Sequence, residues 1–439
     1  MLRNFRNFLL QWKTQLLRTP LVVRGARQVG KTYSIEAFGK EEFKNFISIN
    51  FETSPVYQSC FNELEPRAII NQIELISRQK IVSGEGQTLL FFDEIQQCPK
   101  ALQSLRYFKE KLPELHVIAA GSLLEFTIRD EDFSFPVGRV QFAHMYPLSF
   151  EEYLDASGDT ALKQALSSFQ PSHAPPLAIH QHLLNRVKEY FIIGGMPASI
   201  LAFLSSQSHL EVKYAQKALL TGFEADFGKY ARQSQHRHLK KIFQEVPRLI
   251  GSPIKYSRID PEIPNPAREM KHAIELLRLA GLVYPVSATS AGDLPLLSGL
   301  KENIFKLLFL DIGLVEQAMN IDPQHPGLMT GALAEQFVGQ EFLAMSDPIL
   351  DGRLFFWTRD KGMAEVDYLF SHKGCVYPVE VKAGKTGKLK SLHQFLQEKK
   401  APFGIKISED PLSWNKDILT VPFYLTAHLE RLIEAVSCH

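Results

Sequence analysis

The sequence predicts an α/β protein whose first 155 residues form a parallel sheet covered by helices. Short apolar runs alternate there with stretches that can be helical, as in a series of strand–helix–strand units. Two of the runs, Leu89–Phe92 and Val117–Ala120, are apolar throughout, which is typical of parallel strands buried on both faces. A glycine-containing loop also follows one apolar run and precedes a helix-like stretch, the usual setting of an anion-binding turn.

This loop matches the phosphate-loop pattern G-x-x-x-x-G-K-[ST]. Its glycines let backbone N–H groups turn inward around a polyphosphate, and the N-terminus of the next helix adds its positive dipole end. We predict that Lys31 neutralises the β- and γ-phosphates and that the Thr32 hydroxyl holds Mg²⁺. The predicted nucleotide-binding residues of the loop are Gly25, Ala26, Arg27, Gln28, Val29, Gly30, Lys31 and Thr32.

Two carboxylates, Asp93 and Glu94, end the apolar strand that begins at residue 88. Ligand sites of open parallel sheets lie at the carboxyl ends of the strands, so Asp93 is expected beside the phosphate loop, where it can support Mg²⁺. Glu94 can then polarise the attacking water. The simpler alternative is a buried strand with a polar end. An adjacent base favours hydrolysis over binding alone, so ATP and Mg²⁺ are the expected cofactors.

Ser122 and Arg139 are further candidates for this site. Ser122 follows the strand at 116–120 and is placed to contact the γ-phosphate or the water; alternatively, it only ends the strand. Arg139 is a candidate arginine finger, acting in cis or on the ATP of a neighbouring subunit. A solvated or structural arginine is the alternative. An arginine finger that acts on the ATP of a neighbouring subunit would require a homo-oligomer.

Four runs together resemble a family of prokaryotic AAA+-type P-loop ATPases: R-G-A-R-Q-V-G-K-T, F-F-D-E-I-Q, A-A-G-S-L-L, and G-R with Y-P-L-S-F-E-E-Y. In that family the ATPase module is fused to a C-terminal domain of uncharacterised role. The resemblance continues through G-A-L-A-E-Q-F near residue 331 and V-E-V-K-A-G near residue 380, so it covers nearly the whole chain. It implies an ATPase core over 1–155. The helical pattern that follows resembles a lid over 156–229.

The next region, 230–325, has the element order of a winged helix. Helices are predicted at 238–250 and 266–280, and strands at 282–286 and 305–310. Glu245 is the one acid in a basic stretch that contains Lys229, Arg232, Arg237, Lys240, Lys241, Arg248, Lys255 and Arg258. Contact with DNA phosphates is one interpretation of this stretch. A solvated, partner-facing or inter-domain basic face is the other.

The last region, 326–439, is predicted to be a second α/β domain with the order helix, three strands, helix. Asp367 lies on the second strand, and Glu380 and Lys382 share one face of the third because they are two residues apart. Two carboxylates and a lysine can form a Mg²⁺ site with a charge stabiliser for phosphodiester hydrolysis, with Asp367 and Glu380 as metal ligands.

This pattern resembles the restriction-endonuclease-like nuclease superfamily, which has a carboxylate on one strand and [D/E]-x-K on the next. The resemblance adds Glu335 on the preceding helix and Gln394 on the following one, so the nuclease-like set is Glu335, Asp367, Glu380, Lys382 and Gln394. The alternatives are an inactivated domain kept for DNA or protein binding, and plain surface salt bridging.

Composition narrows the class of protein. The net charge of +1 shows no global basic field, so a nucleic-acid surface would have to be local. The four cysteines show no C-x-x-C spacing, which argues against zinc and disulfides and fits the cytoplasm. No apolar run is long enough to predict a membrane span. Together these predictions describe a Mg²⁺-dependent ATPase that is coupled to DNA binding or processing through its C-terminal domain. The alternative is a nucleotide-controlled regulatory or protein-binding switch with an inactive nuclease-like domain.

Overall fold

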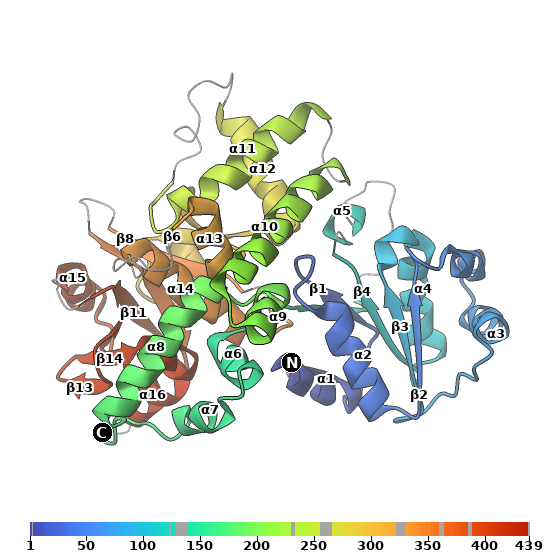
Figure 1. Ribbon diagram of the computed structural model, residues 1–439, viewed down its shortest axis with the longest axis horizontal. Coiled ribbons are helices and arrows are strands. Elements are labelled where there is room, and N and C mark those ends of the chain that lie inside the picture. Colours follow the sequence, from blue (N-terminus) through green and yellow to red (C-terminus); the bar gives the residue numbers. More distant parts are fainter. Residues whose placement is uncertain are drawn as a thin grey trace.

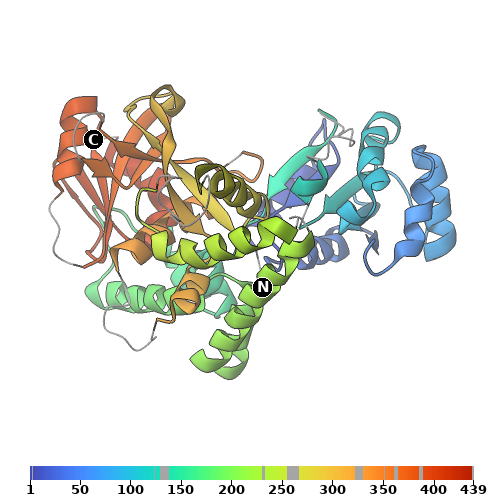
Figure 2. The same cartoon turned by 90° about the horizontal axis from the view of Figure 1, so that it is seen from above.

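The computed structural model describes residues 1, 3–122, 124–128, 138–229, 233–254, 266–321, 330–350, 352–359, 364–384 and 389–437. Within these residues, three β-sheets and the helices around them give an α/β fold. Figure 1 shows the N-terminal sheet at one end of the molecule and the two C-terminal sheets at the other, with helices of the middle region between and above them. The same two lobes are separate when seen from above in Figure 2.

The N-terminal sheet has the strand order β2-β3-β4-β1-β5, and its neighbouring strands are all parallel, as predicted. β3 and β4 are buried at every position, which explains their continuous apolar sequences. The strands are β1 (Leu21–Arg24), β2 (Asn45–Asn50), β3 (Thr88–Asp93), β4 (His116–Ala120) and β5 (Gln141–His144). The helices around them are α1 (Phe5–Lys13), α2 (Lys31–Glu42), η1 (Pro55–Phe61), α3 (Pro66–Ser77), η2 (Ile95–Gln97), α4 (Pro99–Lys111) and α5 (Leu124–Ile128).

The middle of the chain is helical, and its helices contact both lobes. It contains α6 (Phe150–Ala156), α7 (Thr160–Leu166), α8 (Leu177–Ile193), α9 (Pro197–Ser206), α10 (His209–Asp226), η3 (Phe227–Lys229), α11 (Gln233–Leu249) and α12 (Pro266–Leu279). α8 packs on the C-terminal lobe, where His180 Nδ1 lies 2.7 Å from Tyr424 Oη and the Phe191 ring lies 5.2 Å from Phe337. The end of α10 instead reaches the N-terminal sheet, where Asp226 binds Arg27.

The remaining sheets have the orders β7-β6-β8-β9 and β10-β11-β12-β14-β13. β6 pairs with β7 antiparallel and with β8 parallel, so the first of these sheets spans residues 283–366. The elements are β6 (Val283–Thr289), η5 (Leu296–Gly299), β7 (Leu300–Phe309), α13 (Ile312–Met319), α14 (Gly331–Met345), β8 (Leu354–Thr358), β9 (Glu365–Val366), β10 (Tyr368–His372), β11 (Cys375–Lys382), α15 (Lys390–Lys399), β12 (Gly404–Ser408), β13 (Ser413–Asn415), β14 (Ile418–Pro422), η6 (Phe423–His428) and α16 (Leu429–Ser437).

The predicted order of two helices and two strands is present as α11, α12, β6 and β7. The β6–β7 hairpin is part of a larger sheet, and the winged-helix assignment stays a prediction. In the basic stretch, two lysines pair with acids at the end of α10: Lys240 binds Glu224 at 2.9 Å and Lys229 binds Asp226 at 3.0 Å. Arg232, Lys255 and Arg258 lie outside the described residues.

In the part of the chain that the structure describes, no single helix has the length and apolar composition needed to cross a membrane. α8 and α9 reach that length and composition together, but they are bent by 115° at the break between them.

Candidate nucleotide site and C-terminal acidic cluster

The phosphate loop connects β1 to α2 and needs glycine at both ends. Gly25 has φ +135°, and a Cβ there would meet the backbone oxygen of Met145 at 2.2 Å. Gly30 has φ +97° and precedes the first residue of α2. Both backbone conformations are strained for residues with side chains, so the two glycines of the motif fix the shape of the loop.

Lys31 begins α2 and its side chain folds back into the loop. Its ammonium donates to the carbonyls of Gly25 and Ala26, both at 2.8 Å. Burial lowers the pKa of Lys31 to about 8, although Glu94 and Asp93 oppose this shift. A polyphosphate would give this lysine anionic oxygens in place of the two neutral carbonyls.

The end of β3 lies beside the start of α2, as predicted. Asp93 accepts from the Thr32 hydroxyl at 3.1 and 3.2 Å and from the Asn50 amide at 3.0 Å. Burial, and then the nearby Glu94, raise the pKa of Asp93, while these hydrogen bonds oppose the shift. Glu94 follows with a left-handed backbone, φ 49°, and its carboxylate accepts from the Gln96 amide. The strand end thus brings two carboxylates to the phosphate loop.

Arg27 links the phosphate loop to the helical region. Its guanidinium donates to both oxygens of Asp226 at 2.7 Å and to Ser122 Oγ at 3.2 Å. Ser122 therefore lies next to the loop, as required for either of its predicted roles. Arg139 binds Glu110 on α4 at 3.0 Å, and its side chain is 48% exposed. It is placed on the surface rather than with Lys31.

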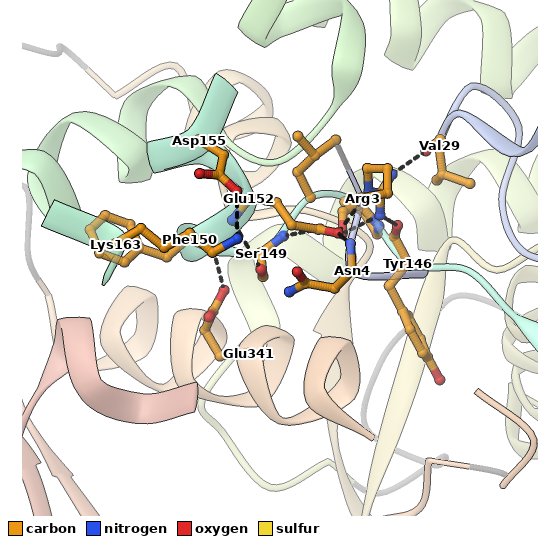
Figure 3. Close-up of polar contacts among 12 residues, drawn as sticks. Arg3, Asn4, Val29, Tyr146, Ser149, Phe150, Glu152, Asp155, Lys163 and Glu341 are labelled. Atoms are coloured by element: carbon orange, nitrogen blue, oxygen red, sulfur yellow. Dashed lines mark hydrogen bonds and ion pairs between the residues drawn. The ribbon is translucent and has the colours of Figure 1, made fainter. Parts of the chain in front are cut away.

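A buried arginine near the N-terminus holds the other side of the loop (Figure 3). Arg3 donates to the carbonyls of Val29 at 2.8 Å and Tyr146 at 2.7 Å, and it binds Glu152 at 3.0 Å. Glu152 also completes the capping box of Ser149 at the start of α6. The next residue, Phe150, donates its N–H to Glu341 on α14 at 2.9 Å. These contacts connect the phosphate loop to the C-terminal lobe, and nothing in the local motif predicts them.

The C-terminal acidic residues gather around a lysine that the motif did not include. Lys306 on β7 is 3% exposed and lies 2.9 Å from Glu335, 2.7 Å from Glu365 and 3.6 Å from Asp367. The three carboxylates raise the pKa of Lys306 against the effect of its burial. The sequence signal that could have identified this residue is the presence of a lysine within the otherwise apolar run Phe305–Phe309.

Glu380 and Lys382 occupy one face of β11, as their spacing predicts, and form an ion pair of 2.6 Å. Asp367 lies at the break between β9 and β10, rather than on a strand as predicted, and accepts from the N–H of Val381 at 2.8 Å. Glu380 is 6% exposed, and its Oε2 has no hydrogen-bond partner among the described residues. Burial and then Asp367 raise the pKa of Glu380 to about 7. Gln394 binds Glu398 on its own helix.

Within the described ranges, no group of three or more His, Cys, Asp or Glu side chains is arranged to hold a metal. Any Mg²⁺ in the C-terminal cluster would therefore depend on Asp367 and Glu380 together with water or substrate oxygens. Mg²⁺ sites with one or two carboxylates and several waters are common where phosphates bind.

Three family models match consecutive parts of the chain. The model described as an AAA domain matches residues 17–154. Two models described as domains of unknown function, DUF8612 and DUF4143, match residues 184–325 and 330–424. The comparison with curated proteins found no significant match.

Among solved structures, the chain is similar to a Walker-type ATPase of Pyrococcus abyssi, with 16% identity and a TM-score of 0.44 over 72% of this chain and 95% of that one. It is also similar to the Aeropyrum pernix ORC2 protein, with 14% identity, a TM-score of 0.35 and coverage of 72% and 90%. Residues 17–154 are therefore similar to AAA domains and contain a phosphate loop between a parallel strand and a helix.

Proposed function

We propose that the protein hydrolyses ATP with Mg²⁺ at the phosphate loop. The meeting of Thr32 and Asp93 supports this function. These two predicted Mg²⁺ ligands are 61 residues apart in the chain, and their side chains are hydrogen-bonded beside Lys31. A hydroxyl at a helix start and a carboxylate at a strand end are the protein groups that hold Mg²⁺ in phosphate-loop enzymes.

In this proposal, Lys31 exchanges its two carbonyl partners for oxygens of the β- and γ-phosphates. Glu94 would accept the proton of the attacking water. Mg²⁺, held by Thr32 and Asp93, would supply positive charge against the negative charge that develops between the phosphates. Arg27 and Ser122 border the position of the γ-phosphate. Because Arg27 is bound to Asp226, phosphate binding there would also change the contact between the loop and α10.

The test is steady-state ATP hydrolysis and ATP binding by three variants. Lys31→Ala should weaken ATP binding, because it removes the charge nearest the phosphates. Glu94→Gln should bind ATP and lose hydrolysis, because the amide keeps the shape but not the basicity. Lys40→Ala, on the exposed side of the same helix with a side chain 65% exposed, is the control and should behave as wild type. Undiminished turnover by Glu94→Gln would remove Glu94 as the base.

Arg139 is proposed to act on the ATP of a neighbouring subunit, since its exposed position on this chain leaves it accessible to one. Mixing Arg139→Ala with Glu94→Gln protein should then restore part of the activity, because some sites combine two intact halves. A mixture that stays inactive, with turnover per subunit independent of protein concentration, would favour a structural role in the pair with Glu110.

A second proposed activity is metal-dependent phosphodiester cleavage at Asp367, Glu380 and Lys382. The buried, unpartnered Oε2 of Glu380 favours it, because such an oxygen is a vacant ligand for a cation. Nucleic-acid cleavage with Mg²⁺ or Mn²⁺ should be lost in both Asp367→Ala and Lys382→Ala. Cleavage that survives both changes belongs to a contaminant. No cleavage with either metal, with or without ATP, would favour the nucleotide-controlled switch with an inactive C-terminal domain.

A further inference from the structure

A cavity of about 1070 Å³ lies between the N-terminal sheet and the α12–β6–β7 unit. One wall is formed by the ends of β1, β4 and β5 with α5, and the other by α12 and the β6–β7 hairpin. Residues 348–350 and 352–353 close one side. The cavity adjoins the phosphate loop, because Gly25 lines it and Gly281, after α12, packs against Ala26. It is the kind of inter-domain space in which ligands commonly bind.

The cavity is electropositive. Its lining contains six Lys or Arg residues and three Glu residues. Two of the glutamates are used in ion pairs, Glu125 with Arg24 and Glu275 with Arg278. Among the described residues, no carboxylate pairs with Arg268 or Lys271, which lie one turn apart on the exposed face of α12. Within this part of the chain, both cations are available to bind an anionic ligand.

An aromatic group with unsatisfied polar atoms lies in the same cavity. The His144 and Tyr146 rings are 4.4 Å apart, and Tyr146 and Tyr284 are 5.5 Å apart. His144 Nε2 and Tyr284 Oη are buried and have no hydrogen-bond partner among the described residues. Burial lowers the pKa of His144 to about 3, so its ring is neutral at pH 7 and offers one donor and one acceptor. Unpartnered buried groups of this kind point to a ligand with polar edges.

We propose that this cavity binds a single strand of nucleic acid, with phosphates on Arg268 and Lys271 and a base against the His144–Tyr146–Tyr284 group. Basic grooves with aromatic side chains bind single strands in this way, and a base edge would satisfy His144 and Tyr284. A duplex keeps its base faces stacked, so it could not place one of them against this aromatic group. This inference rests on the nucleic-acid part of the proposed function and specifies its substrate as single-stranded.

The test is fluorescence anisotropy with a labelled 12-nucleotide oligothymidylate, in EDTA and without ATP, so that binding is separated from cleavage and turnover. Reversing two charges in Arg268→Glu/Lys271→Glu should weaken binding at least tenfold. It should also reduce the slope of log K against log salt by about 1.4, at roughly 0.7 per phosphate on a single strand. The matched control, Arg237→Glu/Lys240→Glu, reverses two charges on α11 outside the cavity and should change affinity less than twofold.

A second variant tests the aromatic group without changing charge. Tyr284→Phe removes an unpartnered hydroxyl, so the ligand-free protein should melt at or above the wild-type temperature while oligonucleotide affinity falls several-fold. An equal or larger loss of affinity in the α11 control would assign DNA to α11 and overturn the proposal. Undetectable binding of the oligonucleotide by the wild type would also overturn the proposal. Competition by poly-glutamate as strong as that by unlabelled oligonucleotide would overturn it too, because it would indicate that the cavity binds an acidic polypeptide.

Discussion

Replacing Arg3 with alanine should both destabilise the protein and weaken its binding of ATP. The side chains of Arg3 and Glu152 are 7% and 5% exposed, so this is a buried ion pair. Without Arg3, the Glu152 carboxylate keeps its backbone donors at Asn4 and Ser149 but loses its countercharge. The carbonyl of Val29 in the phosphate loop also loses its donor.

The expected magnitudes follow from these contacts. Removing one partner of a buried ion pair lowers the free energy of unfolding by about 3–5 kcal/mol. The lost hydrogen bond to the loop contributes about 1 kcal/mol to holding its shape, which corresponds to roughly fivefold weaker ATP binding. The matched comparison on α1 is Arg6, whose side chain is 35% exposed and pairs with Glu41 and Glu42 at the surface. Arg6→Ala should lower the free energy of unfolding by no more than about 1 kcal/mol.

Urea unfolding followed by tryptophan fluorescence and by circular dichroism would measure the stability, and titration calorimetry would measure the ATP affinity. The double variant Arg3→Met/Glu152→Gln should recover much of the stability, because it removes both charges, but not the ATP affinity, because Val29 still lacks its donor. If Arg3→Ala and Arg6→Ala lost the same amount of stability and of ATP affinity, the idea that Arg3 supports the loop would be falsified.

Three further predictions concern buried ionisable groups. Lys306→Met should lower the free energy of unfolding by about 3–5 kcal/mol, because three carboxylates lose their shared cation. Millimolar Mg²⁺ should restore part of the lost stability in a thermal melt. A variant as stable as wild type would contradict the role of Lys306 as the cation of this cluster. Burial raises the pKa of Glu341 to about 8, so the folded state retains a proton that the unfolded state releases, and stability falls as pH rises from about 4.5 to 8. Glu341→Gln should therefore gain stability relative to wild type between pH 5 and pH 8, and a pH-independent difference would argue against this shift. Burial lowers the pKa of His116 to about 4, so its contribution to stability is lost as pH falls from 6.5 to 4; wild type should lose more stability over that range than His116→Phe, as measured by urea unfolding at each pH.

Local signals were sufficient to predict the phosphate loop and its carboxylates. Lys31, Thr32 and Asp93 belong to short motifs whose strand and helix context is visible in the sequence, and the parallel sheet brings them together as expected. The spacing of Glu380 and Lys382 likewise predicted their common strand face. The helix expected over 266–280 is observed at Pro266–Leu279.

The contacts that support these motifs could not be predicted, because they join segments far apart in the chain. Arg3 meets Glu152 across 149 residues, and Arg27 meets Asp226 across 199. No periodicity or spacing records such a pairing. The contacts of Lys306 could be predicted in part. A charge inside an apolar strand indicates a buried partner, but only the fold shows that the partners include Glu335 and Asp367.

The sheet formed by β6, β7, β8 and β9 has a consequence for how this chain can be divided. The two family matches of unknown function meet between residues 325 and 330, yet β6 before that point pairs with β8 after it. Cutting the chain there would leave each fragment with an unpaired, largely apolar strand edge, which favours aggregation. The two regions are therefore expected to fold and to be expressed as one unit, whereas residues 17–154 match a separate family model.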